Sequence, residues 1–185
     1  MKRYHICLSG SGGQGLILAG VLLAHAAVSD GKCVTMTSSY GPEARGGASR
    51  SSLVISEKPI DYPLPCRLDV LLTMNQESCN RYASHLKEDG ILIVDSTRVI
   101  HQPPIRHYSV PFTSMASQAG AVLAANVTAL GTIIGLTGIV RPASLEIALR
   151  ARIKEEMLPL NEKLLKLGLK EGRKLKSHSN EYYTY

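Results

Sequence analysis

The chain has 185 residues, a length at which a single domain buries about 70% of its unfolded surface in one core. Hydrophobic residues make up 44% of the sequence and charged residues 19%, with 16 Gly and 9 Pro. This composition excludes a disordered, a collagen-like or a coiled-coil protein. The sequence has no Trp and one Phe, and three of its eight Tyr fall in the last four residues. A protein that stacks the bases of single-stranded nucleic acid is therefore not expected.

The net charge of +6 is concentrated toward the C-terminus, because residues 141–185 hold ten Lys and Arg against six Asp and Glu. Acids such as Glu162 and Glu171 are interleaved with these bases. A solvated helix face is therefore favoured over a surface that binds an acidic partner, and nucleic acid is not expected as a partner.

The cysteines indicate neither a metal centre nor a disulfide framework. Cys7, Cys33, Cys66 and Cys79 stand at least 13 positions apart. Without a C-x-x-C pair, no iron–sulfur cluster or structural zinc is expected in this chain. Residues 1–4 lead directly into a strand-like segment without the apolar region of a secretory signal, so the expected location is the cytoplasm.

The first 40 residues predict a βαβ unit. Tyr4–Ser9 is a short apolar run typical of a buried strand, and Gln14–Ser29 carries apolar residues at helical spacing. Asp30-Gly31 provides a C-terminal cap for that helix, and Cys33–Ser38 predicts a second strand. Such a unit is expected to be right-handed, with its helix packed on a sheet.

The remaining sequence extends this unit into an α/β domain of three layers. We predict a loop over residues 39–50, a helix over 76–86 that is capped at Asp89-Gly90, and strands over residues 51–56, 69–74, 91–95 and, at an edge, 106–110. Beyond these strands the pattern is helical to about residue 176, broken by Pro142 and Pro159. The predicted fold is Rossmann-like, with a mostly parallel or mixed central sheet and a C-terminal helical layer. We expect one domain over residues 1–176 and a frayed tail over 177–185.

The segment Ala119–Val140 is uncharged for more than twenty residues and contains Gly131-x-x-x-Gly135. Its length would span a bilayer, and its glycine spacing would suit a pair of membrane helices. Asn126, three threonines and further glycines interrupt it, however, and small residues also allow close packing in water-soluble proteins. A helix buried in the protein or under a partner subunit is favoured over a membrane span.

A glycine-rich turn, Gly10-Ser11-Gly12-Gly13-Gln14-Gly15, follows the first predicted strand and opens the first predicted helix. Such a turn suits either an anion held by backbone amides or close packing of helix against strand. A dinucleotide site also needs an acidic residue at the end of the second strand, where Met36-Thr37-Ser38-Ser39-Tyr40 has none. A phosphate-binding P-loop fails as well, because Leu16 stands where the lysine should be.

A second unusual segment, residues 40–50, places Glu43 and Arg45 between glycines. Because this segment follows the second strand, we expect it at the same sheet edge as the glycine turn, on an adjacent strand. Arg45 and Arg50 would then be available for a carboxylate or a phosphate. The alternative is a surface loop whose charges are only solvated, and the functional interpretation is favoured.

The two loops together resemble the gamma subunit, or gamma domain, of the 2-oxoacid:ferredoxin oxidoreductases. The similarity lies in G-S-G-G-Q-G (residues 10–15) and S-Y-G-P-E-A-R-G-G (residues 39–47) and extends to residues 69–75, 90–95 and 126–131. It covers roughly residues 3–172. Pro42 departs from what many relatives carry in this loop.

The resemblance implies a non-catalytic subunit of an enzyme that decarboxylates a 2-oxoacid oxidatively, giving acyl-CoA, CO₂ and reduced ferredoxin. A 2-oxoglutarate enzyme is slightly preferred over a pyruvate or branched-chain one. Thiamine diphosphate, Mg²⁺ and the iron–sulfur clusters are expected in alpha, beta and, where present, delta subunits, with ferredoxin as an indirect partner. This chain alone is expected to hold no cofactor and no metal; coenzyme A in the holoenzyme would contact it or enter nearby. The isolated chain is expected to be inactive and would be compatible with a homodimer.

The predicted site comprises no catalytic residue. It is a polar crevice facing the partner subunits, formed by Gly10, Gly12, Gly13, Gln14, Gly15, Glu43, Arg45, Gly46 and Gly47. Gln14 is equally compatible with a helix cap, whereas Asp95 is expected to cap a helix or turn. Asn126 is expected to bond across a helix or subunit interface, because an unpaired amide in an apolar helix is costly. The six histidines show no metal spacing. The alternative function is a stand-alone nucleotide- or dinucleotide-binding protein that uses the same glycine turn.

Overall fold

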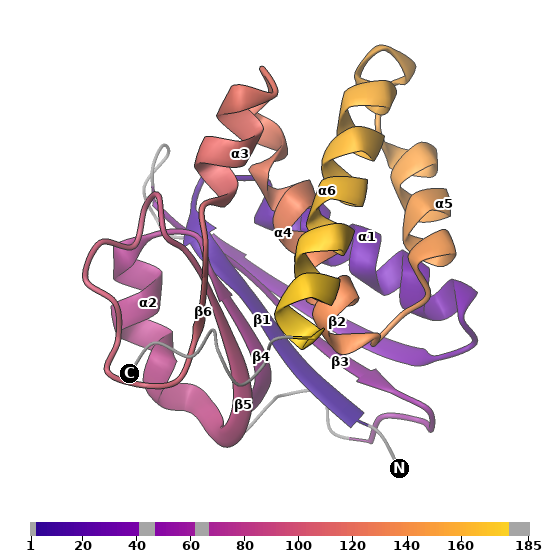
Figure 1. Ribbon diagram of the computed structural model, residues 1–185. Coiled ribbons are helices and arrows are strands. Elements are labelled where there is room, and N and C mark those ends of the chain that lie inside the picture. The colour runs from indigo at the N-terminus through magenta and orange to yellow at the C-terminus, as the bar shows by residue number, and fades with distance from the viewer. Residues whose placement is uncertain (1–2, 41–46, 62–66, 178–185) are drawn as a thin grey trace.

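The computed structural model describes residues 3–40, 47–61 and 67–177. Six strands form one sheet in the order β2-β3-β1-β4-β5-β6 (Figure 1). The strands are β1 (Arg3–Ser11), β2 (Cys33–Tyr40), β3 (Ala48–Ser56), β4 (Leu68–Thr73), β5 (Leu86–Asp95) and β6 (Tyr108–Val110). The predicted edge strand near residue 108 is confirmed, because β6 lies at one end of the sheet.

The sheet is mixed, because β3 runs antiparallel to both of its neighbours while β1, β4, β5 and β6 pair in parallel. The prediction of a Rossmann-like α/β fold with a mostly parallel or mixed sheet is confirmed. The expectation that the first two strands are adjacent is wrong, because β3 is inserted between β1 and β2. The predicted loop over 39–50 is also too long, since β2 continues to Tyr40 and β3 begins at Ala48.

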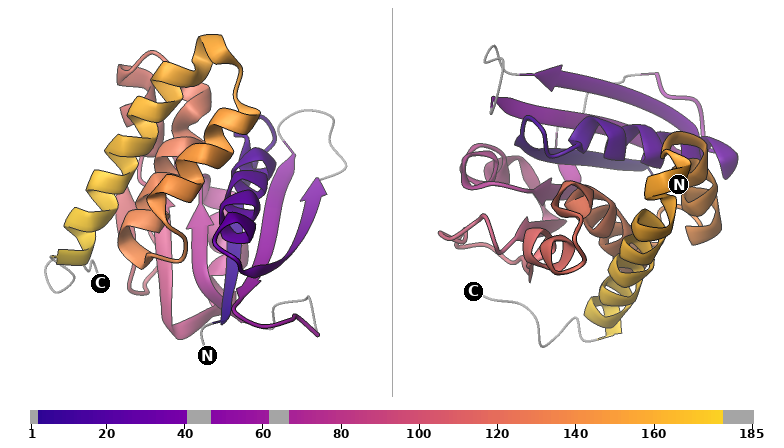
Figure 2. Two further views of the ribbon diagram at one scale, coloured as in Figure 1. Left: turned by 90° about the vertical axis from the view of Figure 1, so that its right-hand side faces the viewer. Right: turned by 90° about the horizontal axis from the view of Figure 1, so that it is seen from above.

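Helices cover the two faces of the sheet unequally. The α-helices are α1 (Leu16–Ser29), α2 (Gln76–Tyr82), α3 (Phe112–Gln118), α4 (Ala125–Thr137), α5 (Pro142–Arg152) and α6 (Leu158–Ser177), with short 3₁₀ turns at Ala83–His85, Val122–Ala124 and Glu155–Met157. Figure 2 shows α1, α4, α5 and α6 on one side of the sheet. There the main core joins Ile6 and Leu8 of β1 to Leu23 of α1 and Leu130 of α4.

A smaller core lies on the other face of the sheet, under α2. Cys7 of β1, Leu71 of β4 and Leu92 of β5 pack there against Cys79 of α2. The alternation of Ile6, Cys7 and Leu8 between the two cores follows from the two-residue period of a strand. Buried apolar residues on both faces explain why these strands appear in the sequence as continuous apolar runs.

Of the two glycine-containing helix caps that the sequence predicts, one is confirmed and one is wrong. The cap at Asp30-Gly31 is confirmed, since Gly31 has a φ of 75° and the Lys32 N–H donates to the Ala27 carbonyl at 3.0 Å. The cap at Asp89-Gly90 is wrong, because both residues lie inside β5 and α2 ends at Tyr82. Gly90 instead lies beside an irregularity in the β4–β5 register, where a Cβ atom would stand 3.0 Å from the Leu68 carbonyl oxygen.

The uncharged segment 119–140 contains the 3₁₀ turn Val122–Ala124 and the 13-residue helix α4, which is buried between α6 and the sheet. Its glycines face two glycines of α6: a Cβ on Gly131 would lie 2.5 Å from the Leu165 carbonyl oxygen, and one on Gly135 would lie 2.4 Å from the Leu169 carbonyl oxygen. Within the described ranges, no helix is long and apolar enough to cross a membrane. The preference for a buried helix over a membrane span is therefore supported.

Candidate functional site

The candidate site lies where the chain changes direction across the sheet. From β1 the chain passes through α1 to β2 on one side, whereas from β4 it passes through α2 to β5 on the other side. The carboxyl ends of the adjacent parallel strands β1 and β4 therefore open into a crevice between diverging connections. Open α/β sheets bind their ligands at such a switch point.

The glycine turn leaves β1 at this point. Gly13 and Gly15 have φ values of 89° and 68°, which side-chain-bearing residues rarely adopt. Gly10 requires glycine for a different reason, because a Cβ there would lie 2.2 Å from Gln14 Oε1 and 2.9 Å from Met74 Cβ. The sequence Gly10–Gly15 therefore encodes a tight turn that approaches β4 closely.

Gln14 holds the turn together. Its Oε1 accepts a hydrogen bond from the Ser11 N–H at 2.6 Å, and its Nε2 donates to the Met74 carbonyl at 2.9 Å. Gln14 therefore braces the turn and does not cap α1, whose N-cap residue is Gly15.

Three backbone amides of the turn already donate hydrogen bonds within the protein, which bears on whether the turn could hold an anion. The Ser11 N–H donates to Gln14, the Gly12 N–H donates to the Gly47 carbonyl at 2.7 Å, and the Gln14 N–H donates to the Ser11 carbonyl at 3.2 Å. A diphosphate would have to displace these bonds to be held as in a dinucleotide site. Close approach of turn, helix and strand is the role that the contacts at Gly10 and Gly15 support directly.

Two asparagines fix the turn from either side. Asn75, which follows β4, donates from Nδ2 to Ser11 Oγ at 2.6 Å while its Oδ1 accepts from the Ser78 N–H at the start of α2. Asn126 at the start of α4 donates from Nδ2 to the Gly15 carbonyl at 2.8 Å. Asn126 is 1% exposed, so its predicted bond across a helix interface is confirmed.

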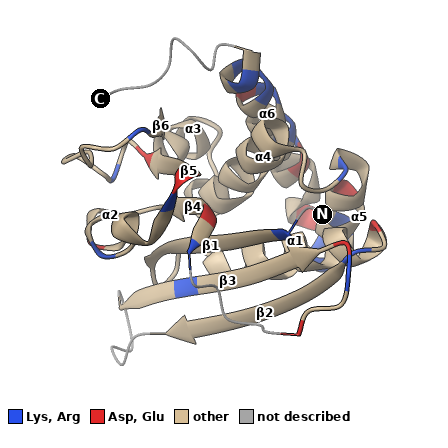
Figure 3. Ribbon diagram, turned by 90° about the horizontal axis from the view of Figure 1, so that it is seen from below, with Lys and Arg blue, Asp and Glu red and all other residues tan. Residues whose placement is uncertain are grey.

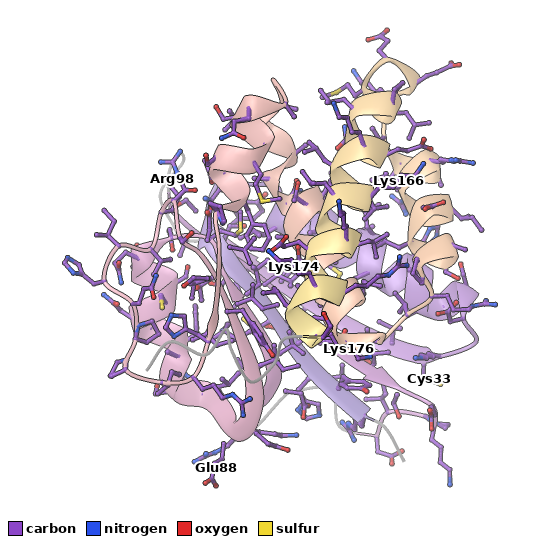
Figure 4. All side chains as sticks on the ribbon, in the orientation of Figure 1. Cys33, Glu88, Arg98, Lys166, Lys174 and Lys176 are labelled. Carbon is purple, nitrogen blue, oxygen red and sulfur yellow. The ribbon has the colours of Figure 1, made fainter. Side chains whose placement is uncertain are left out.

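A cleft of about 140 Å³ opens beside the turn. Its lining residues are Gly13, Gln14, Met74, Arg98, Thr113, Val122, Leu123 and Ala125. Val122 and Leu123 are 47% and 74% exposed, so an apolar rim adjoins an exposed guanidinium. Figure 4 shows Arg98 at this end of the molecule.

Asp95 holds Thr113, one of the residues that line this cleft, in place. Its side chain is fully buried and accepts hydrogen bonds from the Thr113 hydroxyl and from the Thr113 N–H at 3.3 Å. It also accepts from the Thr97 N–H at 3.1 Å. Asp95 therefore caps a turn and the start of α3, as the sequence predicts.

The second predicted loop reaches the same sheet edge. Gly47 contacts the glycine turn through Gly12, and β2 and β3 both extend to this edge. Glu43, Arg45 and Gly46 lie outside the described residues, so their part in the crevice stays a prediction. Arg50 turns to the other face of the sheet, where its guanidinium carbon lies 5.3 Å from the Tyr82 ring centre.

The described residues hold no group of three His, Cys, Asp or Glu side chains that could bind a metal ion. Burial raises the pKa of the Cys7 thiol to about 11, and it also raises the pKa of Cys79. These thiols are therefore poor nucleophiles and poor ligands at neutral pH. Among the described residues that line the cleft, none is a Cys, His, Asp, Glu or Lys that could act as a nucleophile or as a general acid or base.

Sequence reasoning missed Arg98, Asn75 and the apolar rim of Val122 and Leu123. Asn75 had a usable signal, because it stands between a predicted strand and a helix in an N-cap position. Arg98 and the rim had none, since they come to the glycine turn only through the packing of β5 and α4 against β1 and β4.

Fold and site together define an α/β domain in which a glycine turn, held by Gln14 and Asn126, borders a cleft lined by polar and apolar side chains. The family model described as pyruvate ferredoxin/flavodoxin oxidoreductase matches residues 5–171. The chain belongs to this family, which confirms the resemblance seen in the sequence.

Related chains place it more narrowly within the family. The chain is 44% identical over 153 residues to the 2-oxoglutarate synthase subunit KorC of Methanocaldococcus jannaschii, covering 80% of this chain and 82% of that protein. The crystal structure of a keto/oxoacid ferredoxin oxidoreductase gamma subunit from Geobacter sulfurreducens matches with a TM-score of 0.85 and 38% identity over the full length of both chains.

A larger protein contains the same fold as one of its parts. The 2-oxoglutarate:ferredoxin oxidoreductase from Magnetococcus marinus, with 2-oxoglutarate, coenzyme A and succinyl-CoA bound, matches with a TM-score of 0.86 over 95% of this chain and 32% of that chain. At 22% identity this likeness concerns the fold.

Proposed function

We propose that the chain is the non-catalytic gamma subunit of a multi-subunit 2-oxoacid:ferredoxin oxidoreductase. The enzyme would decarboxylate a 2-oxoacid to an acyl-CoA and reduce ferredoxin. The observation that carries the proposal is the braced glycine turn beside a cleft that bears no catalytic or metal-binding set among the described residues. A chain of this kind supplies binding and orientation while cofactors elsewhere supply the chemistry.

The relatives support 2-oxoglutarate as the substrate of the assembled enzyme, since KorC of Methanocaldococcus jannaschii is a 2-oxoglutarate synthase subunit. Thiamine diphosphate, Mg²⁺ and iron–sulfur clusters would belong to alpha, beta or delta subunits, and the assembly would work in the cytoplasm. The isolated chain would be inactive.

We further propose that the cleft takes part of coenzyme A, with Arg45 and Arg98 near its phosphates and the Val122–Leu123 rim beside its less polar arm. Two features of the cleft support this assignment: Arg98 is exposed, and Val122 and Leu123 contribute apolar side chains to the lining. A guanidinium suits phosphate oxygens because it donates two parallel hydrogen bonds. The remaining predicted site residues would shape the crevice around them.

The test replaces Arg98 and Arg45 separately by alanine in the enzyme reconstituted with its other subunits. Loss of a charge-assisted contact should raise the KM for coenzyme A by roughly tenfold, whereas the KM for the 2-oxoacid should stay unchanged. Arg152→Ala, which removes an exposed charge at the end of α5, is the matched control. Unchanged assembly and an unchanged KM for coenzyme A in both variants would defeat the coenzyme A assignment.

The alternative, a stand-alone dinucleotide-binding protein, is disfavoured. In such a site the strand after the first helix pairs directly with the first strand and carries an acid at its end, but here β3 separates β1 from β2. Equilibrium dialysis against NAD(H), FAD and coenzyme A discriminates the two functions, because tight binding of NAD(H) or FAD would favour the alternative.

A further inference from the structure

Helix α6 presents one continuous face of positive charge to solvent. Lys163, Lys166, Lys170 and Arg173 are all exposed and recur at spacings of three and four residues. With about 100° of rotation and 1.5 Å of rise per residue, they fall within an arc of about 80° and along about 15 Å of helix. We call these four residues the cationic stripe. Figure 4 shows Lys166 on α6, away from Arg98.

The two acids of α6 do not neutralise this stripe. Glu162 lies at its margin, is half-buried and is bound by Arg150 of α5, whose Nε lies 2.6 Å from Glu162 Oε1. Glu171 lies outside the arc and is also half-buried. Among the described residues, no salt bridge joins a stripe residue to a carboxylate. Figure 3 shows Lys and Arg in blue on α6, together with acidic residues in red.

This arrangement differs from an ordinary solvated helix, in which acids and bases alternate at spacings of three and four residues and stabilise each other. The opposite face of α6 is buried within the protein, because Gly168 and Gly172 pack against α4. Within the part of the chain that the structure describes, the exposed face is therefore the part of this helix that is available to a second protein. Leu167, 40% exposed, adds apolar surface beside the stripe.

We propose that the cationic stripe of α6 docks an acidic surface on another subunit of the same oxidoreductase. A second copy of this chain is a poor occupant, because a symmetric contact would bring two stripes of like charge together. A membrane is a poor occupant because, of the described residues, Leu167 alone adds a large exposed apolar side chain to α6, and stable insertion needs an apolar face. The proposal rests on the proposed function, since it takes the partner from that assembly.

The test measures binding of the full-length chain to a complex of the remaining subunits, purified without it, over a range of NaCl concentrations. Lys166→Glu combined with Lys170→Glu should weaken binding roughly tenfold at low salt, mainly through slower association, and should flatten the salt dependence. Lys58→Glu combined with Lys154→Glu changes the net charge equally at exposed positions away from the stripe and should alter binding by less than twofold.

The outcomes separate the two proposals. If the unaltered chain does not bind the remaining subunits, the proposed function fails. If it binds but the stripe variant behaves as the control variant does, the docking proposal is wrong and the proposed function stands. Binding of the unaltered chain to anionic vesicles or duplex DNA, lost in the stripe variant while subunit binding persists, would likewise overturn the docking proposal. Circular dichroism of both variants checks that the helix is intact.

Discussion

Gly13 and Gly15 illustrate how neighbouring glycines of one turn serve different purposes. Both have positive φ values, so an alanine at either position adopts a strained backbone conformation. Their surroundings differ, however. A Cβ on Gly13 meets nothing within 4 Å, whereas a Cβ on Gly15 would lie 2.5 Å from Asn126 Nδ2. Gly13 is therefore required by the backbone alone, and Gly15 also by the helix that packs on it.

We expect Gly13→Ala to destabilise the fold by about 1 kcal/mol through backbone strain. We expect Gly15→Ala to cost about 1–3 kcal/mol more, because the new methyl group displaces the amide that holds the Gly15 carbonyl. Thermal unfolding of both variants measures the difference. Asn126→Ala should remove part of the excess cost in the Gly15→Ala background. Equal losses in the two single variants would show that the contact with Asn126 contributes little.

At the scale of elements, the pairing of α4 with α6 decides how the C-terminal helices lie on the sheet. Gly131 and Gly135 of α4 meet Gly168 and Gly172 of α6, so the two backbones approach as closely as side-chain-free residues permit. The Thr132 hydroxyl donates to the Thr128 carbonyl at 3.1 Å and to the Gly168 carbonyl at 3.2 Å. The contact between α4 and α6 is thus stabilised by a hydroxyl hydrogen bond as well as by dispersion.

Gly168→Ala tests this contact, because close packing and helix propensity predict opposite changes in the free energy of unfolding. In an open helix the substitution would stabilise by about 1 kcal/mol. Here the Cβ would lie 2.1 Å from the Thr128 carbonyl oxygen, which belongs to the backbone and cannot rotate away. We expect a net loss of about 3 kcal/mol in urea unfolding. Lys176→Ala, at an exposed position of α6, should be nearly neutral, and a stabilised Gly168→Ala variant would contradict the close packing.

At the scale of the whole molecule, one carboxylate links the first helix to the C-terminal layer. Asp30, at the end of α1, accepts from the Arg141 N–H at 2.7 Å, from Arg141 Nε at 2.8 Å and from the Ser144 hydroxyl at the start of α5. Burial by itself would raise the pKa of Asp30, but the hydrogen bonds from Ser144 and Arg141 outweigh it and lower the pKa. The charged form is therefore the one that the fold stabilises.

The lowered pKa of Asp30 determines how its contribution to stability depends on pH. Because the pKa is lower in the folded than in the unfolded chain, the contribution of Asp30 is complete above about pH 4, the ordinary pKa of an aspartate. It is lost as the pH falls through the folded value. Asp30→Asn should cost about 1–2 kcal/mol at pH 7, and its melting temperature should approach that of the unaltered protein toward pH 3. Asp61→Asn, which changes an exposed carboxylate, is the control. A constant difference from pH 7 to pH 3 would contradict this linkage.

The elements themselves were largely predictable from the sequence, because strands and helices follow from the local period of apolar residues. Tyr4–Ser9, the helix that follows it and the Asp30-Gly31 cap all form as predicted. Boundaries set by distant partners were not predictable. β5 begins at Leu86 because that residue pairs with Leu68, and no local signal there distinguishes a strand from a continuing helix.

The sequence predicted where the site lies, but it did not predict which residues contact one another there. Local sequence alone established the glycine turn, its place after β1 and the family resemblance, since backbone freedom and motif spacing are properties of neighbouring residues. Only the tertiary structure decided that β3 separates β1 from β2, that Gln14 and Asn126 lock the turn, and that Arg98 borders it. The reason is physical: strand order and helix packing depend on which distant surfaces fit together, and that fit is a property of the folded chain as a whole.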